Sequence, residues 1–161
     1  MRRKPMLTVL LSAALLFLGL MLAAPPAATT LAQSGTPGAA PEPITDEMLG
    51  QGAPSNAPGM VLMLERITFA PGAALPVHTH PGAYVLFVES GTFAFTVVTG
   101  EAFVTKAGQT TAQKVGPGPE IILQPGDSLF EQGGVVHSAR NPGSTPAVVL
   151  ASSLLTAGAM H

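Results

Sequence analysis

Residues 72–84 read GAALPVHTHPGAY and place two histidines, His78 and His80, two positions apart between glycine and proline residues. On an extended strand, side chains two positions apart leave the same face, so both imidazoles point to one side. A second stretch, residues 126–141, reads GDSLFEQGGVVHSARN and carries a third histidine, His137. Three neutral imidazoles brought together would form a compact set of nitrogen ligands for a divalent transition metal.

Short apolar segments rich in β-branched residues surround these two stretches, and glycine or proline turns separate them. Strands are predicted over residues 60–69, 84–89, 92–99, 101–105, 110–114, 120–124, 128–131 and 147–155. Many short strands at regular spacing indicate an all-β sandwich or barrel. No amphipathic helix is predicted beyond the N-terminal region.

The N-terminus has a basic start at residues 2–4 and an apolar run over residues 7–22. This pattern predicts a secretory signal peptide over residues 1–32, cleaved after Ala32, and therefore export to the periplasm, the cell surface or the medium. An uncleaved membrane anchor is the alternative, since residues 7–24 reach the lower limit of about 18 residues for a spanning helix. After cleavage no membrane association is expected.

The segment after the predicted signal peptide is rich in glycine, proline and alanine. We interpret residues 33–58 as a flexible linker, residues 59–157 as the folded domain and residues 158–161 as a tail. At 161 residues the chain has room for one domain with a core of its own.

The chain contains no cysteine, so disulfides and thiolate ligands are excluded and a bound metal must accept nitrogen and oxygen donors. Three of the seven basic residues lie in the predicted signal peptide. The remaining four stand against nine acidic residues, a net charge of −5 (four minus nine). Without a basic surface stripe, nucleic-acid binding is not expected.

Residues from about 60 to 155 resemble the cupin superfamily of type 2, whose members are small double-stranded jelly-roll β-barrels. Its first motif is Gly, five residues, His-x-His, three or four residues, Glu, six residues, Gly. Gly72, His78, His80 and Gly91 fit this motif, whereas Tyr84 stands where the glutamate is expected.

The second motif of the family is Gly, five residues, Pro-x-Gly, two residues, His, three residues, Asn. Gly126, Gly134, His137 and Asn141 fit it, and Gln132 replaces the proline. The resemblance implies a divalent transition metal (Fe, Mn, Ni, Cu or Zn) held by His78, His80 and His137. Oxalate degradation, which in the family depends on manganese and the missing glutamate, is not implied.

Two further residues are candidates for the site. Glu131 lies where the family more often has an apolar residue, and we consider it as a fourth metal ligand or as a hydrogen-bond partner of a ligand histidine or of a metal-bound water. The alternative is a strand that turns Glu131 outward to solvent. Tyr84 is expected to face the pocket, with an ordinary half-buried aromatic residue as the alternative.

Several functions fit these features, and the sequence designates no catalytic residue. The first is an exported metal-dependent enzyme, dioxygenase-like or isomerase-like, that acts on a small molecule. The second is a non-catalytic module that binds or senses a small ligand, and the third is a structural role with a vestigial site. The resemblance also implies a homodimer.

Overall fold

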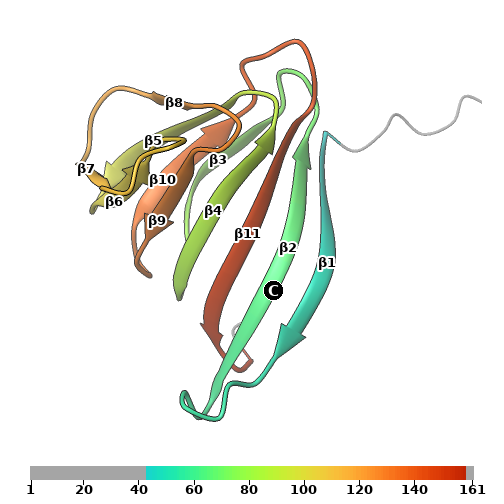
Figure 1. Cartoon of the computed structure of the whole chain (residues 1–161), viewed down its shortest axis with the longest axis vertical. Helices are drawn as coiled ribbons and strands as arrows, with labels where there is room; N and C mark the ends of the chain where they lie inside the picture. The colour runs from blue at the N-terminus through green and yellow to red at the C-terminus, as the bar shows by residue number, and fades with distance from the viewer. Residues whose placement is uncertain (1–42, 159–161) are drawn as a thin grey trace, which may run out of the picture. The chain divides into compact units, whose positions relative to one another are not determined.

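The computed structural model describes residues 43–158, and within this range the chain folds into strands joined by turns and loops (Figure 1). The strands are β1 (Ile44–Gly52), β2 (Met60–Phe69), β3 (Ala74–Thr79), β4 (Ala83–Ser90), β5 (Phe93–Thr99), β6 (Ala102–Thr105), β7 (Gln113–Val115), β8 (Ile121–Leu123), β9 (Ser128–Glu131), β10 (Val136–Arg140) and β11 (Ala147–Thr156). Within residues 43–158 there is no helix long and apolar enough to cross a bilayer.

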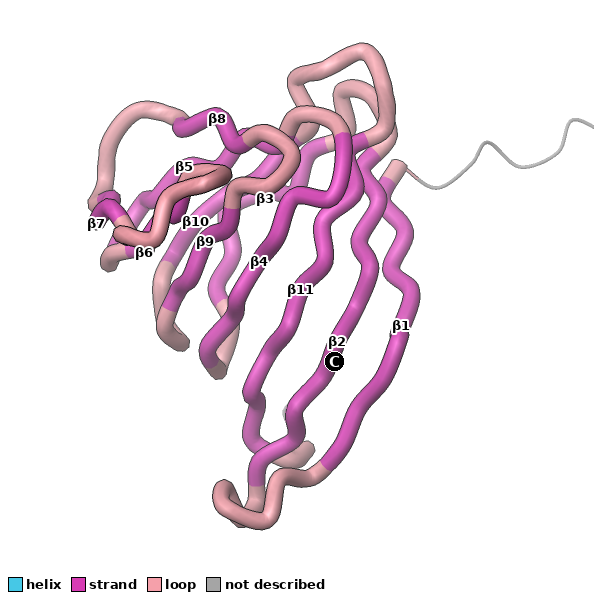
Figure 2. The backbone as a smooth tube through the Cα atoms, viewed as in Figure 1, coloured by secondary structure: helices cyan, strands magenta, loops and turns pink. Residues whose placement is uncertain are grey.

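The strands form two antiparallel sheets. The larger sheet has the order β1-β2-β11-β4-β9-β6-β7, and the smaller one has the order β3-β10-β5-β8. Figure 2 shows the long strands of the larger sheet side by side, with strands from distant parts of the sequence next to one another. Strand β11 pairs with β2 along its full length, from Ala147 opposite Phe69 to Thr156 opposite Met60. The predicted all-β jelly-roll fold is confirmed.

The predicted flexible linker over residues 33–58 is wrong for its middle part. Residues 44–52 form strand β1, which pairs antiparallel with β2 from Ile44 opposite Phe69 to Gly52 opposite Leu62. The segment looked irregular because glycine and proline surround it, yet an edge strand tolerates such a composition when its neighbour supplies the backbone partners. The predicted signal peptide and most of the tail lie outside the described residues.

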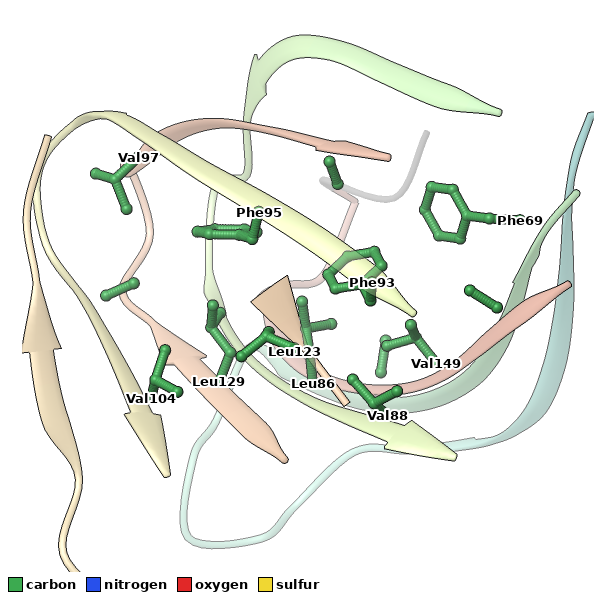
Figure 3. Packing of buried hydrophobic residues seen from close by; sticks show 14 of the residues in the cluster. Phe69, Leu86, Val88, Phe93, Phe95, Val97, Val104, Leu123, Leu129 and Val149 are labelled. Carbon is green, nitrogen blue, oxygen red and sulfur yellow. The ribbon is translucent and has the colours of Figure 1, made fainter. Parts of the chain in front are cut away.

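The core lies between the two sheets and follows the two-residue period of the strands. Along β11, Ala147, Val149, Ala151, Ser153 and Leu155 are buried, while the alternate residues are partly exposed. Figure 3 shows the buried phenylalanine and aliphatic side chains gathered between strands of both sheets.

Two residues of the predicted motifs have structural roles. Gly91 has a φ of 75°, and a Cβ there would collide with the backbone of Pro146 and Ala147. The buried Asn141 side chain donates from Nδ2 to the carbonyls of Phe69, Ala70 and Thr145, and its Oδ1 accepts from the Gly143 amide. Asn141 thereby fastens the end of β10 to the end of β2.

Candidate metal centre and its cavity

The three motif histidines converge from two adjacent strands. His78 on β3 stands directly opposite His137 on β10, and His80 follows the last residue of β3. The ring centroids lie 4.3 Å apart for His78 and His137, 4.8 Å for His78 and His80, and 5.1 Å for His80 and His137. One ring nitrogen from each side chain lies within 4.8 Å of the other two. This arrangement can hold one metal ion.

The outer ring nitrogens of two histidines face carbonyl oxygens. His78 Nδ1 lies 2.8 Å from the Pro76 carbonyl, and His137 Nδ1 lies 3.3 Å from the Val135 carbonyl. A carbonyl oxygen only accepts, so in each neutral ring Nδ1 carries the proton and Nε2 keeps its lone pair. Phe95 stacks on His137 with a centroid distance of 4.8 Å and an interplanar angle of 23°. Both rings are therefore fixed with Nε2 available to a metal.

The electrostatics of the cluster keep two of the rings neutral. Burial and the nearby His78 lower the pKa of His80 to about 4. Burial, followed by the charges of His78 and His80, lowers the pKa of His137 to about 4. Neutral imidazole is the form that coordinates transition metals, so the donor set fits such an ion at neutral pH.

Glu131 lies inside the barrel, next to the histidines. Its side chain is only 1% exposed, and Oε2 lies 3.1 Å from His137 Nδ1 while Oε1 lies 3.8 Å from His80 Nε2. Neither carboxyl oxygen has a hydrogen-bond partner among the described residues. Burial raises the pKa of Glu131 to about 7. The alternative of a solvent-facing Glu131 is therefore wrong.

Tyr84 stands next to Glu131 on the neighbouring strand. The two residues are opposite each other in the β4–β9 pair, and the Tyr84 ring packs against His80 with a centroid distance of 4.2 Å. Burial raises the pKa of the Tyr84 phenol, although an interaction with Ser153 opposes this shift. Ser153 itself is buried, and its hydroxyl has no hydrogen-bond partner among the described residues.

A cavity of about 400 Å³ adjoins the histidine cluster. Its wall is mainly apolar, with three phenylalanines, and it includes the three histidines and Tyr84. Asp46 of β1 and Glu65 of β2 also line it, and sequence reasoning missed both. The sequence did contain a signal for Glu65, because it lies two positions from both Met63 and Ile67 on β2 and so shares their inward-facing side of the strand. Asp46 was hidden, because its segment was interpreted as a linker.

The motif spacing, the jelly-roll topology and the convergent histidines all suggest one family. The Cupin domain family model matches the chain over residues 65–116 and 107–153, together more than half of its 161 residues. This chain is a cupin. The matched region contains the three clustered histidines, Glu131 and Tyr84, whereas strand β1 lies before it.

Similar proteins cover only parts of this cupin. Germin-like protein 1 of Brassica napus is 33% identical over 93 residues, which are 57% of this chain and 38% of that protein. Germin-like protein subfamily 2 member 1 of Arabidopsis thaliana is 37% identical over 90 residues, or 55% of this chain and 35% of that protein. The chain thus spans little more than a third of the length of these curated relatives.

Among solved structures, KdgF from Halomonas sp. is similar to this cupin with a TM-score of 0.47 and 19% sequence identity. The likeness covers 69% of this chain and 78% of that one.

Proposed function

We propose that this cupin binds one divalent transition metal through His78, His80 and His137, and that a small molecule in the cavity completes the coordination. The observation that carries the proposal is the convergence of three imidazoles on one point beside a cavity of about 400 Å³. Three protein nitrogens with open positions are the usual layout of a catalytic metal site. A bound metal would supply Lewis acidity or an oxygen-binding centre there.

The residues around the histidines support this use of the site. The carbonyls of Pro76 and Val135 hold the proton on Nδ1 of His78 and His137, and Phe95 keeps the His137 ring in place. The apolar wall keeps bulk water away from a ligand in the cavity. Tyr84, packed against His80, offers a phenol hydroxyl beside the same space.

For Glu131 we propose the role of a partner to the ligand histidines. Its Oε2 lies 3.1 Å from the outer nitrogen of His137, the side that a metal on Nε2 leaves free. A carboxylate at this position fixes the ring and offsets the charge of a bound cation. Exchange of Glu131→Gln keeps the shape and removes the charge, and we expect metal affinity to fall about 10-fold to 100-fold.

The proposed metal site is tested by elemental analysis of the protein purified without a polyhistidine tag. We expect about one transition-metal ion per chain and its loss in His137→Ala. The matched control is His161→Ala, which removes the one histidine outside the motifs and is expected to keep the metal. Equal metal content in His137→Ala and the unchanged protein would refute the proposal.

The reaction class is proposed as dioxygenase-like or isomerase-like, and a non-catalytic binding module is the second candidate. The cavity beside the histidines favours both, because each needs a small ligand near the metal. The identity of the bound metal separates them. Iron, copper, nickel or manganese favours the enzyme, while zinc calls for direct turnover assays.

Export remains part of the proposal, on the strength of the basic and apolar pattern of residues 1–32. N-terminal sequencing of the protein after expression in a secreting host tests it. A mature chain beginning at Gln33 is expected, and a chain still beginning at Met1 in the membrane fraction would support the anchor instead.

A homodimer is also proposed, supported by the outward face of the larger sheet. Leu64, Ser152, Val85, Phe130 and Phe103 stand opposite one another across five neighbouring strands. This row carries no charge, and Leu64 and Val85 are 42% and 47% exposed. An uncharged apolar face can pack on its own copy without repulsion. Sedimentation analysis of Val85→Glu is expected to show monomers, and an unchanged mass would argue against this face.

A further inference from the structure

The acidic side chains of residues 43–158 fall into two groups: those that form an ion pair with lysine or arginine and those that do not. All four basic side chains of this range form ion pairs: Arg66 with Glu47 and Glu89, Lys106 with Asp127, Lys114 with Glu101, and Arg140 with Glu120. The other three acidic residues of the described range, Asp46, Glu65 and Glu131, form no ion pair with lysine or arginine. Two of these line the cavity, and the third contacts His137.

Asp46 and Glu65 share one face of the larger sheet. In the β1–β2 pair, Asp46 stands opposite Ile67 and Glu65 stands opposite Met48, so the two acids are diagonal neighbours. Burial raises the pKa of Asp46, and burial followed by the charge of Asp46 raises the pKa of Glu65. Both carboxylates therefore gain from a cation placed between them.

The cavity supplies independent evidence for a ligand at this place. It is a hollow of about 400 Å³ with an apolar wall that includes Phe69, Phe93 and Phe95, and no lysine or arginine lines it. A volume of this order falls within the range of small-molecule sites. The histidines come from the smaller sheet and its continuation, whereas the two carboxylates come from the larger sheet.

We infer that the cavity binds a small organic cation, with its apolar body against the phenylalanines and its ammonium group at Asp46 and Glu65. The opposite end of the ligand would face the histidines, and only this part of the inference rests on the proposed metal function. Ammonium donors form charge-assisted hydrogen bonds with carboxylates, and aromatic faces attract the same charge. A carboxylate ligand of equal size would meet two like charges.

The test compares three probes of similar size: 2-phenylethylamine, 2-phenylethanol and 3-phenylpropanoate. Binding to the full protein is measured by ligand-observed NMR and calorimetry at a pH of about 8, where the carboxylates are ionised and the amine is protonated. We expect 2-phenylethylamine to bind at least about tenfold more tightly than 3-phenylpropanoate, with the alcohol between them.

Matched variants assign the preference to the two cavity acids. The double exchange Asp46→Asn and Glu65→Gln is expected to remove the preference for the amine. The control is Glu47→Gln with Glu89→Gln, which also removes two negative charges but from residues that pair with Arg66. The control is expected to keep the preference, and circular dichroism checks that both double variants fold.

Three results would overturn the inference: no detectable binding of the amine, equal or tighter binding of the carboxylate, or an unchanged preference in the cavity variant. Each measurement is made on chelator-treated and on zinc-loaded protein. A charge preference that persists without metal supports the cation site even if the histidines bind no ion. If the protein binds one metal ion per chain but shows no preference for the amine, the cation site is refuted and the metal site is not. The failure of one proposal can therefore be told from the failure of the other.

Discussion

Asp127, which directly precedes β9, and Glu131, the last residue of β9, are two buried carboxyl groups with different surroundings. Asp127 is 3% exposed and accepts hydrogen bonds from Lys106 Nζ at 2.7 Å, the Ala107 amide at 2.8 Å and the Gln124 amide at 2.9 Å. Glu131 is 1% exposed, and its oxygens have no hydrogen-bond partner among the described residues.

The pKa values of the two groups move in opposite directions. Burial opposes ionisation of Asp127, but its hydrogen bonds with Lys106 and the two backbone amides outweigh that cost and lower its pKa. Burial alone raises the pKa of Glu131 to about 7. A satisfied buried carboxylate stabilises a fold, whereas an unsatisfied one costs stability and is typical of a functional site. Asp127 thus has the environment of a structural acid, whereas Glu131, four positions later, has the environment expected for the role proposed for it beside the histidines.

Among the variants that probe the difference between Asp127 and Glu131, Asp127→Asn is expected to change the free energy of unfolding most. The amide loses the charge-assisted bond from Lys106 and presents an NH₂ group to backbone donors, so the free energy of unfolding should fall by about 2–4 kcal/mol. Urea denaturation measures it. The control Glu101→Gln removes an exposed pair with Lys114 and should change stability by less than about 1 kcal/mol. If both variants changed the free energy of unfolding equally, the buried hydrogen bonds of Asp127 would contribute no more to stability than an exposed ion pair.

A smaller effect of opposite sign is expected from Glu131→Met. Removal of an unsatisfied buried carboxyl group should raise the stability of the metal-free protein by about 1–2 kcal/mol. The same variant should bind metal more weakly, which isothermal titration with zinc measures. A variant that loses stability without metal would place Glu131 among the structural acids beside Asp127.

Lys106→Met probes the partner of Asp127 and should have a more modest effect. Lys106 Nζ also donates to the Ile122 carbonyl at 2.9 Å, but its side chain is 44% exposed and water can replace part of its role. The two backbone amides continue to satisfy Asp127. Loss of about 1 kcal/mol in the free energy of unfolding is expected from denaturation curves. A loss as large as that in Asp127→Asn would mean that the lysine alone stabilises the carboxylate.

The smallest effect concerns pH. Because the folded pKa of Asp127 lies below its unfolded value of about 4, its stabilisation is complete above that pH and is lost as the pH falls through the folded pKa. The stability difference between the unchanged protein and Asp127→Asn should therefore shrink in acid. Thermal melts of both proteins between neutral and acidic pH measure it. A constant difference would contradict the lowered pKa.

Sequence reasoning found the features that depend on local spacing. The β-branched segments predicted an all-β sandwich or barrel, and the family resemblance carried by the two histidine motifs implied the jelly roll. Strands 60–69 and 128–131 have the predicted bounds. The convergence of His137 with His78 required the family resemblance, because it depends on pairing between strands that are distant in the chain.

The features that could not be predicted from the sequence depend on which strands become neighbours in the sheets. Strand β1 is stabilised by its pairing with β2 rather than by its own composition, so Asp46 stayed hidden. The inward direction of Glu131 follows from the register that sets it opposite Tyr84 and Ala102. Neither of its carboxyl oxygens has a hydrogen-bond partner among the described residues, and this depends on the assembled interior rather than on any local pattern.

Strand β11 is the last of the described strands along the chain, yet it occupies an inner place in the larger sheet between β2 and β4. Strands β2 and β4 do not pair with each other, so β11 is the strand that joins them into one sheet. The larger sheet therefore depends on a pairing between strands that are distant in the sequence, which slows its formation.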